Sequence, residues 1–230
     1  MKSIDADLRE IEDFIDNLQF SSKDIRNQKI RPAFKSAYKQ FKAVLIWNSF
    51  LQRKADIDDE LKLFIRECTS DLSHSFYLFV LNFYKPARVL ARSSIENFLR
   101  ATLIHKSVNV FEIKSVFELF SSSKNMFSQD QDFLRLTAEI ESLYASLCKT
   151  VHSTKFDYMS QVTSFENFSK FKISYANSDI STLRKLSSSI NKYLFIIFRY
   201  NINEMNYKNS DIILDSIPRS MKRKSMLLGE

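Results

Sequence analysis

The sequence contains a single glycine, Gly229, and only three prolines among its 230 residues. Hairpin turns and strand connections depend on glycine and on Asn-Gly or Asp-Gly pairs, so an all-β or α/β fold would lack its usual turn chemistry. Glycine-rich phosphate loops, of the Walker type or the dinucleotide-binding type, are excluded for the same reason. The scarcity of glycine therefore argues against kinase, GTPase and Rossmann-type functions.

Cysteine and histidine are also scarce, with two and three residues respectively. Cys68 and Cys148 do not have the spacing of metal ligands, and the histidines form no HExxH-type motif. Both cysteines lie in apolar helical contexts, which favours reduced residues in the core. We therefore expect no metal site and no cofactor.

The apolar runs are short. FYLFVLNFY (76–84) and YLFIIF (193–198) fall well below the roughly 20 residues needed to cross a bilayer. The first residues, MKSIDADLREIEDF, are charged throughout and do not have the pattern of a signal peptide. These features predict a cytoplasmic protein with no membrane partner.

Apolar residues recur every three or four positions along most of the chain, which is the pattern of amphipathic helices. Because 44% of the residues are apolar, the chain can bury a sizeable core. We predict an all-α, single-domain bundle of about seven helices over residues 1–207, followed by a basic, flexible tail over 208–230. The expected helices are 4–19, a long helix after Pro32, one from DIDDE (56–60) to about Tyr84, 86–108, 110–120, 131–151, and 178–207 with Ser178 or Asp179 as its cap. Residues 121–132 and 153–177 are expected to be loops.

The chain is basic, with a net charge of +7 and a sequence pI of about 9.3. Such a balance favours anionic partners, although a charge of this size can also serve only to keep a protein dispersed. The tail concentrates basic residues that can contact nucleic acid or an acidic protein partner, or can simply be solvated. These residues are Arg219, Lys222, Arg223 and Lys224.

Segment 86–108 carries Arg92, Glu96 and Arg100 at intervals of four residues. On a helix these side chains form i,i+4 pairs, which are either a solvated ladder of ion pairs or part of a functional site. Four residues separate Arg100 from His105, the next candidate along the chain. An arginine can stabilise charge on a phosphate and a histidine can transfer a proton at neutral pH, and metal-independent RNA cleavage needs both.

A second group of polar residues ends the 131–151 helix, in YASLCKTVHS (144–153). If this helix packs beside 86–108, Tyr144 or His152 can face the Arg92–Glu96 pair, as a supporting or phosphate-binding group.

The segments ARSSIENFLR (91–100) and YASLCKTVHS (144–153) together resemble HEPN-like helical proteins of bacterial toxin–antitoxin and antiphage-defence systems. The resemblance covers about residues 75–155. It implies a ribonuclease motif made of Arg100 and His105, completed at a homodimer interface by the same motif of a second copy. The sequence departs from the family pattern at Ala101, where a polar residue is usual, and in placing the motif inside a middle helix.

Two hypotheses follow from the sequence. In the first, the chain is a HEPN-like, dimeric protein that cuts or binds RNA through Arg100 and His105. In the second, it is a non-catalytic helical subunit that docks onto a larger partner in a defence or nucleic-acid-processing complex. Arg100 and His105 facing each other across a two-fold axis in an open cleft would favour the first hypothesis, and both residues buried, or splayed on a monomer, would favour the second.

Overall fold

The computed structural model describes residues 28–151 and 171–222, and these residues contain helices and no strands. The α-helices are α3 (Arg31–Leu51), α4 (Asp59–Val80), α5 (Tyr84–Ile104), α6 (Val116–Met126), α7 (Gln131–Val151), α9 (Ile173–Phe198) and α10 (Tyr207–Ser216). Two 3₁₀ helices, η1 (Val110–Glu112) and η3 (Arg199–Glu204), join them. The all-α prediction is confirmed.

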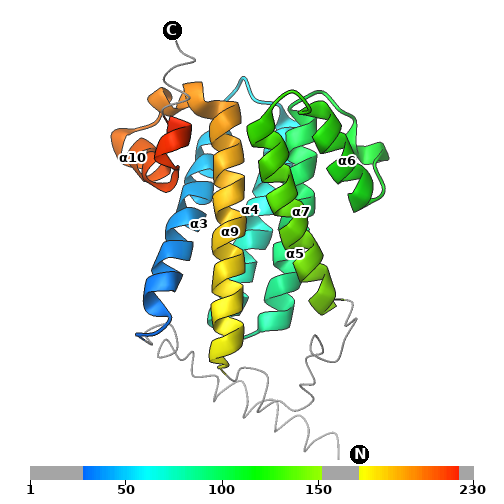
Figure 1. The fold of residues 1–230 in the computed structure, drawn as a ribbon. Coiled ribbons are helices and arrows are strands. Elements are labelled where there is room, and N and C mark those ends of the chain that lie inside the picture. Colours follow the sequence, from blue (N-terminus) through cyan, green and yellow to red (C-terminus); the bar gives the residue numbers. More distant parts are fainter. Residues whose placement is uncertain (1–27, 152–170, 223–230) are drawn as a thin grey trace, which may run out of the picture.

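The helices form a bundle in which α9 lies between α3 and α7 (Figure 1). Helices α4 and α5 form a hairpin and pack along each other, and α5 also packs against α7. Helix α6 lies outside α5 and α7, and α10 packs on α3. Within the described ranges, no helix has both the length and the apolar character that a bilayer span requires.

Side chains and prolines mark where the helices begin. Asp58 accepts hydrogen bonds from the backbone N–H groups of Glu60 and Leu61, and so caps α4 as the DIDDE stretch predicts. Ser115 caps α6 in the same way through the N–H of Glu118. Pro32 lies in the first turn of α3, where its missing N–H has no cost.

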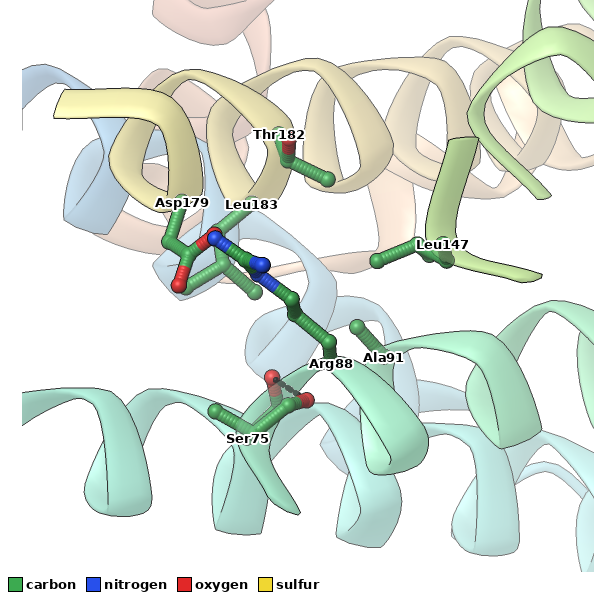
Figure 2. A pocket seen from close by; sticks show the side chains of 8 residues that line it. Ser75, Arg88, Ala91, Leu147, Asp179, Thr182 and Leu183 are labelled. Carbon is green, nitrogen blue, oxygen red and sulfur yellow. Dashed lines mark hydrogen bonds and ion pairs between the residues drawn. The ribbon is translucent and has the colours of Figure 1, made fainter. Parts of the chain in front are cut away.

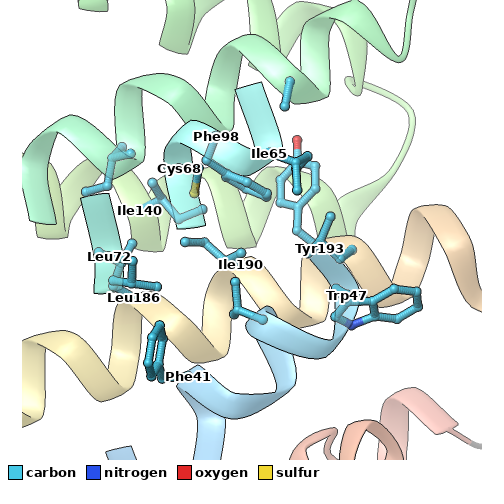
Figure 3. Close-up of a cluster of buried hydrophobic side chains, with 14 of the residues drawn as sticks. Phe41, Trp47, Ile65, Cys68, Leu72, Phe98, Ile140, Leu186, Ile190 and Tyr193 are labelled. Carbon is cyan, nitrogen blue, oxygen red and sulfur yellow. The ribbon is translucent and has the colours of Figure 1, made fainter. Parts of the chain in front are cut away.

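The core is built from apolar faces of α3, α4, α5, α7 and α9 (Figure 3). Trp47 of α3 is fully buried, and its indole N–H donates to Oδ1 of Asn191 on α9 over 2.9 Å. Asn191 in turn donates to the hydroxyl of Ser216 at the end of α10. Because these polar groups are paired inside the core, they fix the register of three helices at once.

Several boundaries differ from the sequence prediction, and among them α9 ends at Phe198 instead of continuing to 207. Helix α6 runs to Met126, into a segment expected to be a loop, because Leu119, Phe120 and Ser123 are buried. Helix α5 ends at Ile104 instead of continuing to 108, since Ser107 has a φ of 60° and leaves the helical path. Helix α9 begins at Ile173, so Asp179 lies inside the helix and does not cap it.

The segment after Tyr207 also differs from the expected flexible tail. Helix α10 occupies Tyr207–Ser216, and Ile213, Ile217 and Met221 are buried. The described part of this segment is therefore packed on the bundle.

Candidate functional site

Arg100 supports the backbone after α5. Its guanidinium donates to the carbonyl of Val110 over 2.6 Å and to that of Ile113 over 3.2 Å. These carbonyls belong to η1 and its C-terminal flank, so Arg100 holds the turn that leads from α5 to α6. Its guanidinium is thus engaged by two backbone carbonyls of the protein.

His105 is the first residue after α5, and it is exposed. One edge of its ring contacts Phe198 at the end of α9, with ring centroids 5.5 Å apart. Partial desolvation of the imidazole beside this ring, with the charge of Lys106 as a second cause, lowers the pKa of His105. Arg100 faces η1 and His105 faces α9, so one chain does not unite them in a site.

Arg92, Glu96 and Tyr144 form a closed cluster between α5 and α7. Arg92 Nε donates to the Tyr144 hydroxyl over 2.8 Å, and that hydroxyl donates to Glu96 Oε1 over 2.9 Å. The ion pair from the Arg92 guanidinium to the same Glu96 oxygen measures 3.3 Å. The structure thus brings Tyr144 to the Arg92–Glu96 pair, as the sequence analysis expects from helix packing.

The hydrogen bonds of this cluster connect α5 to α7. Burial and the neighbouring Glu96 raise the pKa of Tyr144, although the hydrogen bond from Arg92 opposes the rise, so the phenol stays protonated. The guanidinium also lies over the Tyr144 ring, 5.1 Å from its centroid. Arg92 and Glu96 satisfy each other through Tyr144, and this favours a structural role for all three residues.

A second ion pair, buried more deeply, joins α5 to α9. Arg88 Nε donates to Asp179 Oδ1 over 2.7 Å (Figure 2). The same guanidinium donates to Thr150 of α7 over 3.2 Å. Asp179 is 4% exposed, and burial raises the pKa of its carboxyl from 3.8 to about 6 despite the charge of Arg88. The hollow beside the pair measures about 10 Å³, which is room for one water at most, so it is not a substrate site.

A groove with a volume of about 470 Å³ lies between α7 and α9. We call it the α7–α9 groove. Its lining is polar apart from one leucine and holds three cationic side chains and one acidic side chain. The lining residues are Glu139, Ser142 and Leu143 of α7, and Arg184, Lys185, Ser188, Ser189 and Lys192 of α9.

Two cations of the groove are available to a ligand. Arg184 and Lys185 are exposed, and within the described ranges neither has an ion-pair partner. Lys192 lies 3.9 Å from Oε2 of Glu139, and Ser189 donates to the same oxygen over 3.2 Å. Cations and hydroxyls in one groove can bind phosphate and sugar groups.

This groove is not among the sites predicted from the sequence. Arg184, Ser188 and Lys192 lie four residues apart on one helix face, and that signal was readable in RKLSSSINK (184–192). The pairing of this face with Glu139 and Ser142 depends on which helices become neighbours, and local spacing does not encode it.

The remaining candidates lie elsewhere. Arg219 is exposed and Lys222 is half-buried in a helical turn after α10, while His152, Arg223 and Lys224 lie outside the described residues. Among residues 28–151 and 171–222, no group of three His, Cys, Asp or Glu side chains is arranged to hold a metal ion.

Comparisons with protein-family models, with curated proteins and with solved structures found no match to this chain.

Proposed function

We propose that this protein binds RNA and that the α7–α9 groove receives the sugar-phosphate backbone. The observation that carries the proposal is the clustering of Arg184, Lys185 and Lys192 with the hydroxyls of Ser142 and Ser188 in one groove. Phosphate contacts from Arg, Lys and Ser side chains supply most of the affinity of proteins for nucleic acids. The net charge of +7 adds a general attraction for a polyanion.

The dimensions of the groove favour a single strand. Its volume of about 470 Å³ is that of a site for a small molecule, so a ribose-phosphate unit or a base can enter it. A double helix can only lie across the rim of such a groove. Single-stranded segments, with unstacked bases and accessible sugars, are therefore the proposed ligand.

We further propose that binding, rather than cleavage, is the activity of a single chain. Arg100 donates to two carbonyls and His105 packs on Phe198, so neither is poised beside the other on a phosphate. The resemblance to HEPN-like proteins supports RNA as the ligand. It also motivates the proposal that the protein acts in a bacterial defence or toxin system, as a homodimer or as a subunit of a larger complex.

The proposal is tested by fluorescence anisotropy with a labelled, mixed-sequence single-stranded RNA at several salt concentrations. Each lost phosphate contact lowers the affinity and reduces the slope of log K against log[salt] by about 0.7 for a single strand. The groove variant is Arg184→Gln with Lys185→Gln. We expect it to bind more weakly than wild type, with a slope smaller by about 1.4.

The matched control is Lys35→Gln with Lys42→Gln, which removes the same charge from exposed positions on α3. Helix α3 lies on the other side of α9 from α7 (Figure 1). We expect the control to keep the affinity and salt slope of wild type. The proposal would be contradicted if the two variants lost RNA affinity equally, or if folded wild-type protein did not bind the RNA.

A further inference from the structure

The acidic side chain in the α7–α9 groove is at odds with a surface that only binds phosphate. Glu139 is the one acid among the described residues that line the groove, beside three cations. An ionised carboxylate repels phosphate oxygens. Its own oxygens can accept hydrogen bonds but cannot donate them. The ligand group that lies against Glu139 is therefore a hydrogen-bond donor and not a phosphate.

The Glu139 carboxylate is held in place from the opposite helix. Ser189, which is 2% exposed, donates to Glu139 Oε2 over 3.2 Å, and Lys192 lies 3.9 Å from the same oxygen. In the described part of the chain, both contacts are to Oε2, and the Glu139 side chain remains 43% exposed. An ionised carboxylate has about four acceptor positions, so acceptor capacity remains for a ligand.

The donor that recurs beside every phosphate of RNA is the ribose 2′-hydroxyl. It donates and accepts hydrogen bonds, and it is the group by which proteins distinguish RNA from DNA. The groove places a fixed carboxylate acceptor next to serine hydroxyls and to cations suited to the adjacent phosphate. A base amino group is also a donor, but it occurs on only some bases and would make binding depend on sequence.

Given the proposed RNA binding, we infer that Glu139 accepts a hydrogen bond from a ribose 2′-hydroxyl in the α7–α9 groove and thereby selects RNA over DNA. Arg184 and Lys185 supply the affinity for the backbone, and Glu139 supplies the discrimination. Ser189 acts as a positioning residue, because it contacts Glu139 and is itself buried.

The inference is tested with three oligonucleotides that share one uracil-containing sequence and differ only at the 2′ position: RNA, DNA and 2′-O-methyl RNA. A 2′-O-methyl group cannot donate a hydrogen bond. We expect wild-type protein to bind RNA about tenfold more tightly than either analogue, the effect of one hydrogen bond to a charged group. In Glu139→Met the three affinities become equal, and that for DNA rises or stays the same because a repulsive charge is gone.

The matched control is Glu141→Met. Glu141 lies on the same helix, but it pairs with Lys124 of α6 over 2.6 Å and does not line the groove. Its loss removes the same charge from α7, and the preference for RNA should remain. Circular dichroism melts of both variants identify any general loss of folding.

The outcomes separate the two proposals. If wild-type protein binds the three oligonucleotides equally, or if Glu139→Met weakens all three alike, the inference about Glu139 is wrong and the RNA-binding proposal stands. If folded wild-type protein binds none of the three, the RNA-binding proposal itself fails.

Discussion

Arg88 Nε donates a hydrogen bond to Asp179 Oδ1 over 2.7 Å, and this pair connects α5 with the first turns of α9. The Asp179 carboxyl is almost fully buried, and in the described residues its second oxygen has no hydrogen-bond partner. A buried carboxylate with an incomplete set of partners is held less favourably than one in water.

This environment predicts a specific dependence of stability on pH. The pKa of Asp179 is raised from 3.8 to about 6, so the folded protein binds this proton more tightly than the unfolded chain. The resulting stabilisation is fully present below about pH 4 and is lost as the pH rises through 6. In Asp179→Asn the amide replaces the titrating group, so the free energy of unfolding of the variant relative to wild type should increase by on the order of 2–3 kcal/mol between pH 4 and 7.

Urea unfolding at several pH values measures this difference. Asp215→Asn is the control, because Asp215 is an exposed partner of Lys39 and its side chain is 64% accessible. The free energy of unfolding of the control should differ from that of wild type by a similar small amount at every pH. A difference between Asp179→Asn and wild type that does not change with pH would show that this carboxyl titrates as it does in the unfolded chain.

Replacing Arg100 should destabilise the turn after α5 and should not abolish a catalytic step. Arg100→Ala removes two hydrogen bonds to backbone carbonyls, and the carbonyl of the buried Val110 loses its charged donor. We expect a loss of about 1.5–3 kcal/mol in the free energy of unfolding. Faster amide hydrogen exchange around residues 110–113 would localise the effect.

His105→Ala serves as the comparison, since His105 is exposed and should cost no more than about 0.5 kcal/mol. Both variants and wild type should leave a single-stranded RNA pool intact in the absence of metal. RNA cleavage by wild type that disappears in both folded variants would instead support the ribonuclease hypothesis.

Asn191 should be a critical polar residue of the core. It accepts from the indole N–H of Trp47 and donates to Ser216, so Asn191→Ala leaves a buried N–H unpaired and releases the end of α10. We expect a loss of about 2–4 kcal/mol in the free energy of unfolding. Trp47 is the only tryptophan, so a red shift of the emission spectrum reports water near its ring. Asn125→Ala, at an exposed position of α6, should leave stability and emission unchanged.

Local pattern was sufficient to predict several elements. Helix α7 has the predicted bounds, 131–151, because Leu136, Ile140 and Leu147 recur at helical spacing and are all buried. The start of α9 was misplaced because Asp179 was read as a cap, whereas its carboxylate pairs with Arg88 of α5. A residue's local preference gave no sign of this distant partner.

The candidate site was harder to predict than the fold. The expected motif of Arg100 and His105 followed one helix in sequence, but the two side chains contact different neighbours. The α7–α9 groove depends on two helices that are distant in sequence, with Glu139 on one and Ser189 and Lys192 on the other. The spacing along α9 indicates one polar face of the groove, but only tertiary packing brings Glu139 of α7 beside that face.

The scarcity of glycine has a consequence for stabilising the protein by mutation. Asn82 and Ser107 both adopt left-handed backbone conformations, with φ values of 65° and 60°. The side chain of Asn82 accepts a hydrogen bond from the Tyr84 hydroxyl, and replacing Asn82 with glycine would remove that bond. Ser107 is exposed, and a side chain in the left-handed conformation costs about 1–2 kcal/mol that glycine avoids. The net gain in stability from glycine is smaller than this, because glycine loses more backbone entropy when the chain folds. A chain that almost lacks glycine thus has, at Ser107, a position where directed evolution for thermal stability should favour that residue.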